Sequence, residues 1–96
     1  MSHIIKHKES DSKGKFYMED ETGITSELRY SKPENGVFVI DHTETKKEFT
    51  GKGLASKLVK ESVKYARENN LKIVPGCSYA KAYFDRHKEF KDVLKD

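Results

Sequence analysis

One long amphipathic segment, residues 52–68, limits the folds that this chain can adopt. At 100° per residue, one half of its helical wheel is apolar or small and the other half is charged or carries serine. The apolar half contains Leu54, Ala55, Leu58, Val59, Val63, Tyr65 and Ala66. Apolar runs stand before and after the segment, at residues 37–40 and 71–74. A strand, a helix and a strand in this order predict a β-α-β unit with parallel strands and a right-handed crossover.

The part of the chain before this unit alternates between short strands and turns. Three polar runs predict turns, at residues 9–14, 20–23 and 31–36. Strands are expected at residues 3–8, 15–19, 24–30 and 37–45. Within the third strand, Ile24, Leu28 and Tyr30 fall on one face at a period of two. Strands joined by such short turns form an antiparallel meander.

A second, shorter helix is expected from Ser78, because Tyr79, Tyr83 and His87 recur at helical spacing. Residues 90–94 add a final turn. The predicted fold class is therefore α+β. It has an antiparallel meander of about four strands, then a β-α-β unit with a parallel strand pair, and a C-terminal helix.

Length and charge narrow the class of protein further. The 96 residues fit one domain, residues 1–96, which buries about two thirds of the surface of the unfolded chain. The 19 basic and 16 acidic residues are interspersed, so the net charge of +3 gives only a mild preference for anionic ligands.

One cysteine forms no internal disulfide, which suits a reducing compartment. No apolar run approaches the ~20 residues that cross a membrane, and no signal-peptide core is seen. We expect a cytoplasmic monomer or weak dimer with no membrane or nucleic-acid partner.

The start of the long amphipathic segment contains residues that weaken a helix. Glycine costs up to ~1 kcal/mol at a helical position, which applies to Gly51 and Gly53. Lys52 carries a positive charge at the end of the helix where the macrodipole is already positive. A bound phosphate would reverse these effects, because bare amides, the dipole and the lysine all favour an anion. The alternative is a tight strand-to-helix turn with Thr50 as the N-cap.

Two other phosphate-binding loops fit this segment less well. A P-loop requires a glycine where Lys46 stands, and a dinucleotide fingerprint requires a third glycine where Ser56 stands. A different phosphate-binding fold is therefore indicated.

The segment Thr50-Gly-Lys-Gly-Leu-Ala55 resembles the acyl-CoA loop of the GNAT superfamily of N-acyltransferases, whose pattern is Gln/Arg-x-x-Gly-x-Gly/Ala. Gly53 and Ala55 match the two small positions, and Lys52 is placed to contact phosphate. Thr50 departs from the pattern, since Gln or Arg is usual there. The resemblance covers nearly the whole chain, which is similar to a short, single-domain, N-acetyltransferase-like branch. That branch lacks the first strand and the helices that shape the acceptor site in longer members.

The resemblance implies acetyl-CoA or coenzyme A as the co-substrate. Its pyrophosphate would lie on the loop amides, and its pantetheine would lie along the strands that end at Thr45 and Val74. The expected cofactor-binding residues are Thr43, Glu44, Thr45, Thr50, Gly51, Lys52, Gly53, Leu54 and Ala55.

Three side chains are candidates for the chemistry of acyl transfer. Tyr83 resembles the superfamily tyrosine near the CoA sulfur, which protonates the leaving thiolate, although a core aromatic would have the same helical spacing. Cys77 lies where a strand ends and a helix starts, a position that favours a reactive thiolate. It would act as a nucleophile or line the thioester pocket, and a small buried cysteine is the alternative. His42 shares a strand face with Glu44, and either could take a proton from an amine. The alternative is that both are ordinary polar residues on the surface near the end of a strand.

No metal site is predicted, because His3 and His7 are close in sequence but have no third ligand. The predicted function is a small acetyl-CoA-dependent N-acetyltransferase that acts on an unidentified amine of a small molecule or a protein. A non-catalytic acyl-CoA-binding or protein-interaction module is the alternative, favoured by the shortened fold and by Thr50. A basic nucleic-acid-binding domain ranks last, because no clustered basic and aromatic stripe is seen.

Overall fold

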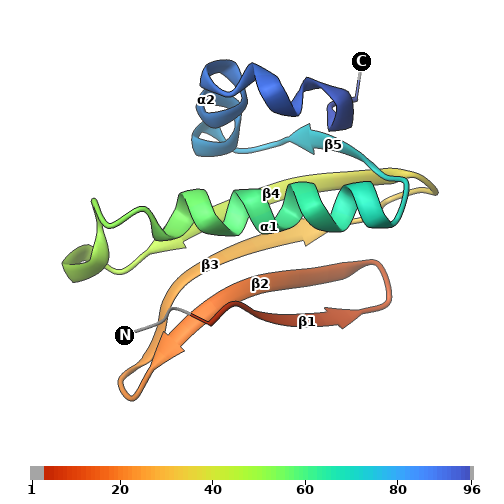
Figure 1. Cartoon of the computed structure of the whole chain (residues 1–96). Coiled ribbons are helices and arrows are strands. Elements are labelled where there is room, and N and C mark those ends of the chain that lie inside the picture. The colour runs from red at the N-terminus through yellow and green to blue at the C-terminus, as the bar shows by residue number, and fades with distance from the viewer. Residues whose placement is uncertain (1–3, 96) are drawn as a thin grey trace.

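In the part of the chain that the structure describes, five strands form one mixed sheet in which every strand lies beside its neighbour in the sequence (Figure 1). The computed structural model describes residues 4–95. The strands are β1 (Lys6–Ser10), β2 (Lys13–Asp20), β3 (Gly23–Ser31), β4 (Val37–Thr45) and β5 (Lys72–Pro75). β1 to β4 pair antiparallel, and β4 pairs with β5 in parallel. The predicted meander followed by a parallel strand pair is confirmed.

Helices connect and follow these strands. α1 (Leu54–Glu68) is the crossover between β4 and β5, and α2 (Ser78–Arg86) follows β5. Two 3-10 helices, η1 (Lys47–Phe49) and η2 (Lys88–Val93), precede α1 and follow α2. Within residues 4–95, no helix is both long and apolar enough to span a membrane.

The first hairpin has a tighter turn than the sequence suggested. Glu9 pairs with Gly14 and Ser10 pairs with Lys13, so residues 11 and 12 alone connect the strands. The turn predicted at residues 9–14 was therefore too long. A two-residue hairpin turn requires positive φ, and Asp11, with φ 52°, is a residue type that tolerates it. The predicted strand began at His3, which lies outside the described residues.

A β-bulge corrects the predicted face of Ile24. Met18 of β2 pairs with Ser26, but Glu19 pairs with Ile24, so Thr25 is an extra residue in β3. One extra residue reverses the alternation of side chains, and this places Ile24 on the face opposite Leu28. The prediction that Ile24 shares a face with Leu28 and Tyr30 was wrong for this reason.

The core lies between α1 and one face of the sheet, and α2 and η2 close it at the β5 side (Figure 1). The buried apolar side chains of α1 are Leu54, Leu58, Val59, Val63 and Ala66, and those of the strands include Phe16, Met18, Leu28, Tyr30, Phe38, Ile40 and Ile73. Each large apolar side chain buried in this way contributes about 1.5–3 kcal/mol. α1 and the sheet together hold the end of β4 and the following loop in place.

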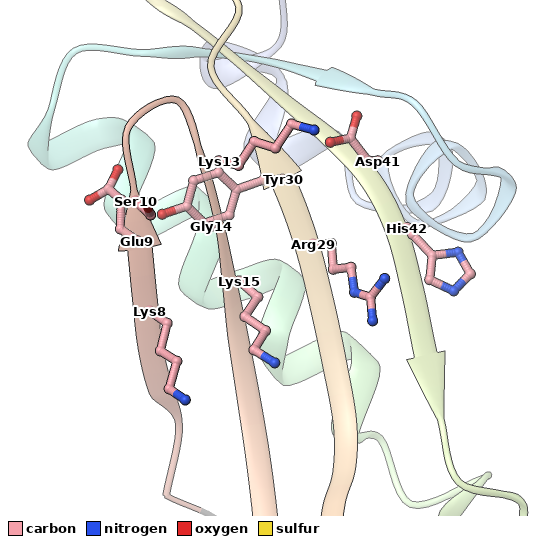
Figure 2. Close-up of a pocket in the computed structure, with 10 residues that line it drawn as sticks. All are labelled: Lys8, Glu9, Ser10, Lys13, Gly14, Lys15, Arg29, Tyr30, Asp41 and His42. Carbon is pink, nitrogen blue, oxygen red and sulfur yellow. The ribbon is translucent and has the colours of Figure 1, made fainter.

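The opposite face of β1 to β4 carries no helix within the described residues. Figure 2 shows this face, with α1 behind the strands and several charged side chains in front of them. The sheet thus has one covered face and one bare face.

Candidate functional site

β4 and β5 separate partway along their length. They pair from Val37 with Lys72 to Ile40 with Pro75, and the Gly76 N–H then donates to the Ile40 carbonyl at 2.9 Å. Beyond this point, residues 42–45 of β4 pair with β3 alone among the described strands. The other backbone edge of this part of β4 is therefore open to an extended ligand.

A second β-bulge lies where the two strands separate. Arg29 of β3 pairs with His42, whereas Tyr30 pairs with Ile40, so Asp41 is an extra residue in β4. Bulges bend a strand and change the direction of its side chains, and they are frequent beside functional sites.

The loop before α1 is shaped by two glycines in left-handed conformations. Gly51 has φ 81° and Gly53 has φ 77°, and an added Cβ would meet no heavy atom within 4 Å at either position. Glycine is therefore required here by backbone conformation and not by close packing. Because Gly53 is left-handed, α1 begins at Leu54 and not at Lys52, where the amphipathic pattern starts.

The amino end of α1 is uncapped. Gly53 is the N-cap, no side chain in the described residues caps the helix, and the first turn contains no acid. The Thr50 hydroxyl instead donates to the Lys47 carbonyl at 2.8 Å. The alternative that Thr50 caps the helix is thus wrong. The first amides of a helix have no intrahelical acceptor, and here no described side chain accepts a hydrogen bond from them as a cap.

A cavity of about 510 Å³ connects this loop with the open end of β4. Its walls are formed by Thr43, Glu44, Thr45, Phe49, Thr50, Gly51, Gly53, Leu54, Ala55 and Tyr79. Every cofactor-binding residue expected from the sequence lies in these walls, except Lys52, which is exposed. Phe49 and Tyr79 were missed. Phe49 directly precedes Thr50, and Tyr79 lies one helical turn before Tyr83, so each is an aromatic residue close to a predicted site residue. That closeness is the signal by which the sequence could have identified them.

Cys77 lies next to the same cavity. It is the N-cap of α2, where its Sγ accepts a hydrogen bond from the Ala80 N–H at 3.5 Å. The thiol also lies 3.8 Å from the Oγ1 of Thr43, which lines the cavity. The half-buried thiol therefore sits at the amino end of α2 and beside the open part of β4.

Tyr83 and Tyr79 occupy different environments on α2. Tyr83 is 1% exposed, and its hydroxyl has no hydrogen-bond partner in the described residues. Its ring stacks on His87 at 4.2 Å and on Tyr79 at 6.4 Å between centroids. Tyr79 lines the cavity itself, and partial burial, reinforced by Tyr83, raises the pKa of its hydroxyl. The structure thus places Tyr79 in the cavity wall and Tyr83 against it on the inner side.

His42 and Glu44 lie on the bare face of the sheet. His42 Nε2 is 3.7 Å from the Glu44 carboxylate, and both side chains are more than half exposed. The intervening Thr43 pairs with the buried Leu28, whereas His42 pairs with the exposed Arg29. The expected sharing of one strand face is confirmed. β4 therefore stands between His42 on one side and the contact of Thr43 with Cys77 on the other.

No candidate metal centre accompanies these groups. Within residues 4–95, no three His, Cys, Asp or Glu side chains come together as they would around a metal ion.

Comparison with known proteins gives a family match over most of the chain. The model of the family described as GCN5-related N-acetyl-transferase matches residues 15–93. A GCN5-like protein from Staphylococcus aureus has a solved structure that is 38% identical in sequence and superposes with a TM-score of 0.76. The match covers 99% of this chain and 91% of that one. No curated protein matches the chain.

Two longer proteins share the fold at lower identity. A GNAT family acetyltransferase from Elizabethkingia anophelis with acetyl-CoA bound has a TM-score of 0.60 and 15% identity, over 80% of this chain and 53% of that one. A ribosomal-protein-alanine N-acetyltransferase from Brucella melitensis biovar Abortus 2308 has a TM-score of 0.59 and 17% identity, over 91% of this chain and 64% of that one. The chain thus spans between about half and two thirds of these two proteins.

Proposed function

The chain belongs to the GCN5-related N-acetyltransferase family, and from this we propose that its glycine-rich loop holds acetyl-CoA for transfer of the acetyl group to an amine. The observation that carries the proposal is one cavity that joins the uncapped start of α1 to the open edge of β4. A phosphate group fits the first feature, and an extended, amide-containing chain fits the second. Coenzyme A contains both.

The pyrophosphate would be held by the backbone amides of residues 51–55. The two left-handed glycines leave space beside these amides, and the helix dipole favours negative charge there. Lys52 is exposed next to them and adds a counter-charge. The pantetheine amides would hydrogen-bond to the backbone of residues 43–45, in the manner of an added strand. Thr50, whose hydroxyl donates to the Lys47 carbonyl, leaves out the side-chain phosphate contact that Gln or Arg would make at this position.

The chemistry requires one group that takes a proton and one that gives a proton. The amine nitrogen attacks the thioester carbonyl carbon, the carbon–sulfur bond breaks, and the CoA thiolate leaves. His42 takes the proton that the amine loses, directly or through one water. A tyrosine hydroxyl gives a proton to the thiolate. Tyr83 is assigned to this role by the family resemblance, and Tyr79 competes for it because it lines the cavity.

Cys77 is proposed to line the pocket of the thioester, since its Sγ is 3.8 Å from a hydroxyl in the cavity wall. A covalent role would transfer the acetyl group first to the Cys77 sulfur and then to the amine. Mass spectrometry of the protein after brief exposure to acetyl-CoA separates these two roles. Acetylation that is lost in Cys77→Ala and that decays on addition of an amine supports the covalent role.

Calorimetric titration with acetyl-CoA tests the binding site. Gly53→Glu places a carboxylate at the amino end of α1, and we expect the affinity to fall by at least about tenfold, the equivalent of 1.4 kcal/mol. Gly36→Glu is the matched control, because Gly36 has a similar φ of 79° and equally open surroundings in the turn between β3 and β4. Equal affinity in the two variants, or no saturable binding at millimolar acetyl-CoA in the wild type, would refute the site.

A non-catalytic acyl-CoA-binding module is the second candidate. It is favoured by Thr50 in the loop, where Gln or Arg is usual. Release of free thiol from acetyl-CoA, measured with a panel of amines, distinguishes the two. An enzyme shows amine-dependent release that drops by about 100-fold or more when its acid or base is removed. The variants are Cys77→Ala, Tyr79→Phe, Tyr83→Phe and His42→Gln. Binding without amine-dependent release identifies the module.

A further inference from the structure

A row of basic side chains crosses the bare face of the sheet. Lys8 pairs with Lys15, Lys15 pairs with Arg29, and Arg29 pairs with His42. The row therefore places one ionisable nitrogen-containing side chain on each of β1, β2, β3 and β4. We call these four residues the basic row; Figure 2 shows them on the side of the strands away from α1.

The basic row is unfavourable for the sheet by itself, because like charges directly opposite each other destabilise a strand pair. One acid compensates part of it. The Glu27 carboxylate, whose side chain is 8% exposed, lies 3.0 Å from Arg29 and 3.7 Å from Lys15. Lys8 has no ion pair within residues 4–95 and lies over the ring of Tyr17 at 5.7 Å.

Among the remaining acids around the row, Glu44 lies near His42, which belongs to the row, and Glu19 pairs with Lys6, which does not. Glu9 pairs with Lys32 on the covered side, and Asp41 accepts a hydrogen bond from Ser31 at 3.3 Å. Positive charge thus exceeds negative charge along the row.

A cavity of about 810 Å³ lies along the basic row. Lys8, Lys15, Arg29 and His42 all line it, and Lys13 adds a further ammonium group at its edge. Glu9 and Asp41 are the acids in its walls. The lining holds four permanently charged cations, on Lys8, Lys13, Lys15 and Arg29. Glu9 is paired with Lys32, and one carboxylate, that of Glu27, is shared by Lys15 and Arg29, so a net positive charge remains that suits a small anion.

We propose that this cavity is the acceptor site, and that the acceptor is an amine which also carries a phosphate or carboxylate group. The proposal rests on the proposed acetyl transfer. His42, the candidate base, ends the basic row, and its neighbour Thr43 faces the other side of β4 and lines the acetyl-CoA cavity. The amine would therefore meet the thioester where β4 and β5 separate. The anion would lie on Arg29, with support from Lys15 and Lys8. Adjacent strands are about 4.8 Å apart, so the amine would stand roughly 5 Å from the anion.

Matched amines test the acceptor class. The phosphate arm compares O-phosphoethanolamine with ethanolamine, and the carboxylate arm compares β-alanine with β-alaninamide. Thiol release from acetyl-CoA gives kcat and KM for each amine. We expect a KM at least about tenfold lower for the anionic member of one or both pairs, since a hydrogen bond to a charged group is worth about 1.5–3 kcal/mol. The arm with the larger ratio identifies the anion. The ratio should shrink as salt is added.

Two charge-removing variants locate the effect. Arg29→Gln should raise KM about tenfold for the anionic amine and leave the neutral amine unchanged. Lys8→Gln should act in the same direction but less, and it leaves both ion pairs of Glu27 in place. Lys64→Gln, on the exposed side of α1, is the control of equal charge. Equal KM within both pairs of amines, or equal effects of Arg29→Gln and Lys64→Gln, would overturn the proposal while leaving acetyl transfer intact.

A binding experiment keeps the proposal testable if no amine is acetylated, an outcome that would instead refute the proposed function. Backbone amide shifts are recorded while O-phosphoethanolamine or β-alanine is added. The basic row should shift in the wild type and much less in Arg29→Gln. Shifts that are absent, or that are the same in both proteins, would overturn the anionic site.

Discussion

The two faces of the sheet differ in how their polar side chains are paired. On the face covered by α1, Glu9 accepts hydrogen bonds from Lys32 and from the Tyr65 hydroxyl, the latter at 2.9 Å. The Tyr30 hydroxyl there lies 2.5 Å from His7 Nε2, and burial raises its pKa, so that it stays neutral. On the bare face, cations stand opposite one another, with the Glu27 carboxylate between two of them.

This difference indicates that the covered face contributes most of the stability and that the bare face is available for a ligand. Paired polar groups and a packed core stabilise the covered face. The bare face has ion pairs of its own, at Glu19 and Glu27, but it also places Lys8 directly opposite Lys15, which costs stability, and such local exceptions are expected at functional sites. Because both faces belong to the same strands, substitutions on the two sides separate the contribution to stability from the contribution to binding.

The largest expected effect is on the covered face. Leu58 is fully buried between α1 and the sheet, and Leu58→Ala should lower the free energy of unfolding by about 2–5 kcal/mol. Urea unfolding followed by circular dichroism measures this loss. Lys64→Ala on the exposed side of α1 should change it by no more than about 0.5 kcal/mol. Similar losses in both variants would mean that α1 does not pack as described.

A smaller effect is expected from the polar cluster at the edge of the covered face. Hydrogen bonds from Lys32 and Tyr65, with the Lys32 charge, hold the pKa of Glu9 below its ordinary value. Glu9→Gln should cost about 1 kcal/mol at neutral pH, because the carboxylate is partly exposed and its charged hydrogen bonds are weakened by solvent.

The same substitution has a defined pH dependence. A depressed pKa in the folded state stabilises the protein above the unfolded pKa of about 4.3, and this stability is lost as pH falls through the folded pKa. The wild type should therefore exceed Glu9→Gln in stability at pH 7 and lose that advantage in acid below about pH 4. Thermal melts across this range, with Glu34→Gln in an exposed turn as the control, measure the difference. A constant gap at all pH values would contradict the role of the carboxylate.

The smallest expected effect has the opposite sign. Lys8 stands directly opposite Lys15 on the bare face, so Lys8→Gln should raise the free energy of unfolding by about 0.2–0.5 kcal/mol at low salt. The gain should fade at high salt, where the repulsion is screened. If Lys8→Gln gains stability in this way and also binds an anionic amine more weakly, the basic row contributes to binding and not to stability. A loss of stability at low salt would mean that Lys8 has a structural role.

The sequence predicted the features that depend on residue type within one element. Leu58, Val59 and Val63 show the 3.6-residue repeat that predicts α1. Gly51 and Gly53 indicate the unusual start of this helix, because a left-handed backbone conformation favours glycine. The meander and the parallel strand pair followed from these local signals.

The features that depend on register were not predictable in the same way. The basic row joins Lys8, Lys15, Arg29 and His42, which are far apart in the sequence, and they align through a two-residue turn at Asp11 and the two bulges. The bulge at Thr25 also made the face of Ile24 unpredictable. Likewise, the periodicity of α2 placed Tyr79 and Tyr83 on one side of the helix, but only the packing of α2 shows which hydroxyl borders the cavity.

The central claim is that acetyl-CoA occupies the loop of α1 and the open edge of β4, while the basic row remains for the acceptor. Backbone amide shifts on titration with acetyl-CoA test it most directly, because the basic row could itself attract the phosphates of coenzyme A. The account predicts the largest shifts at residues 43–45 and 51–55, with only small ones at Lys8, Lys15 and Arg29. The largest shifts on the bare face, with the loop unchanged, would contradict it.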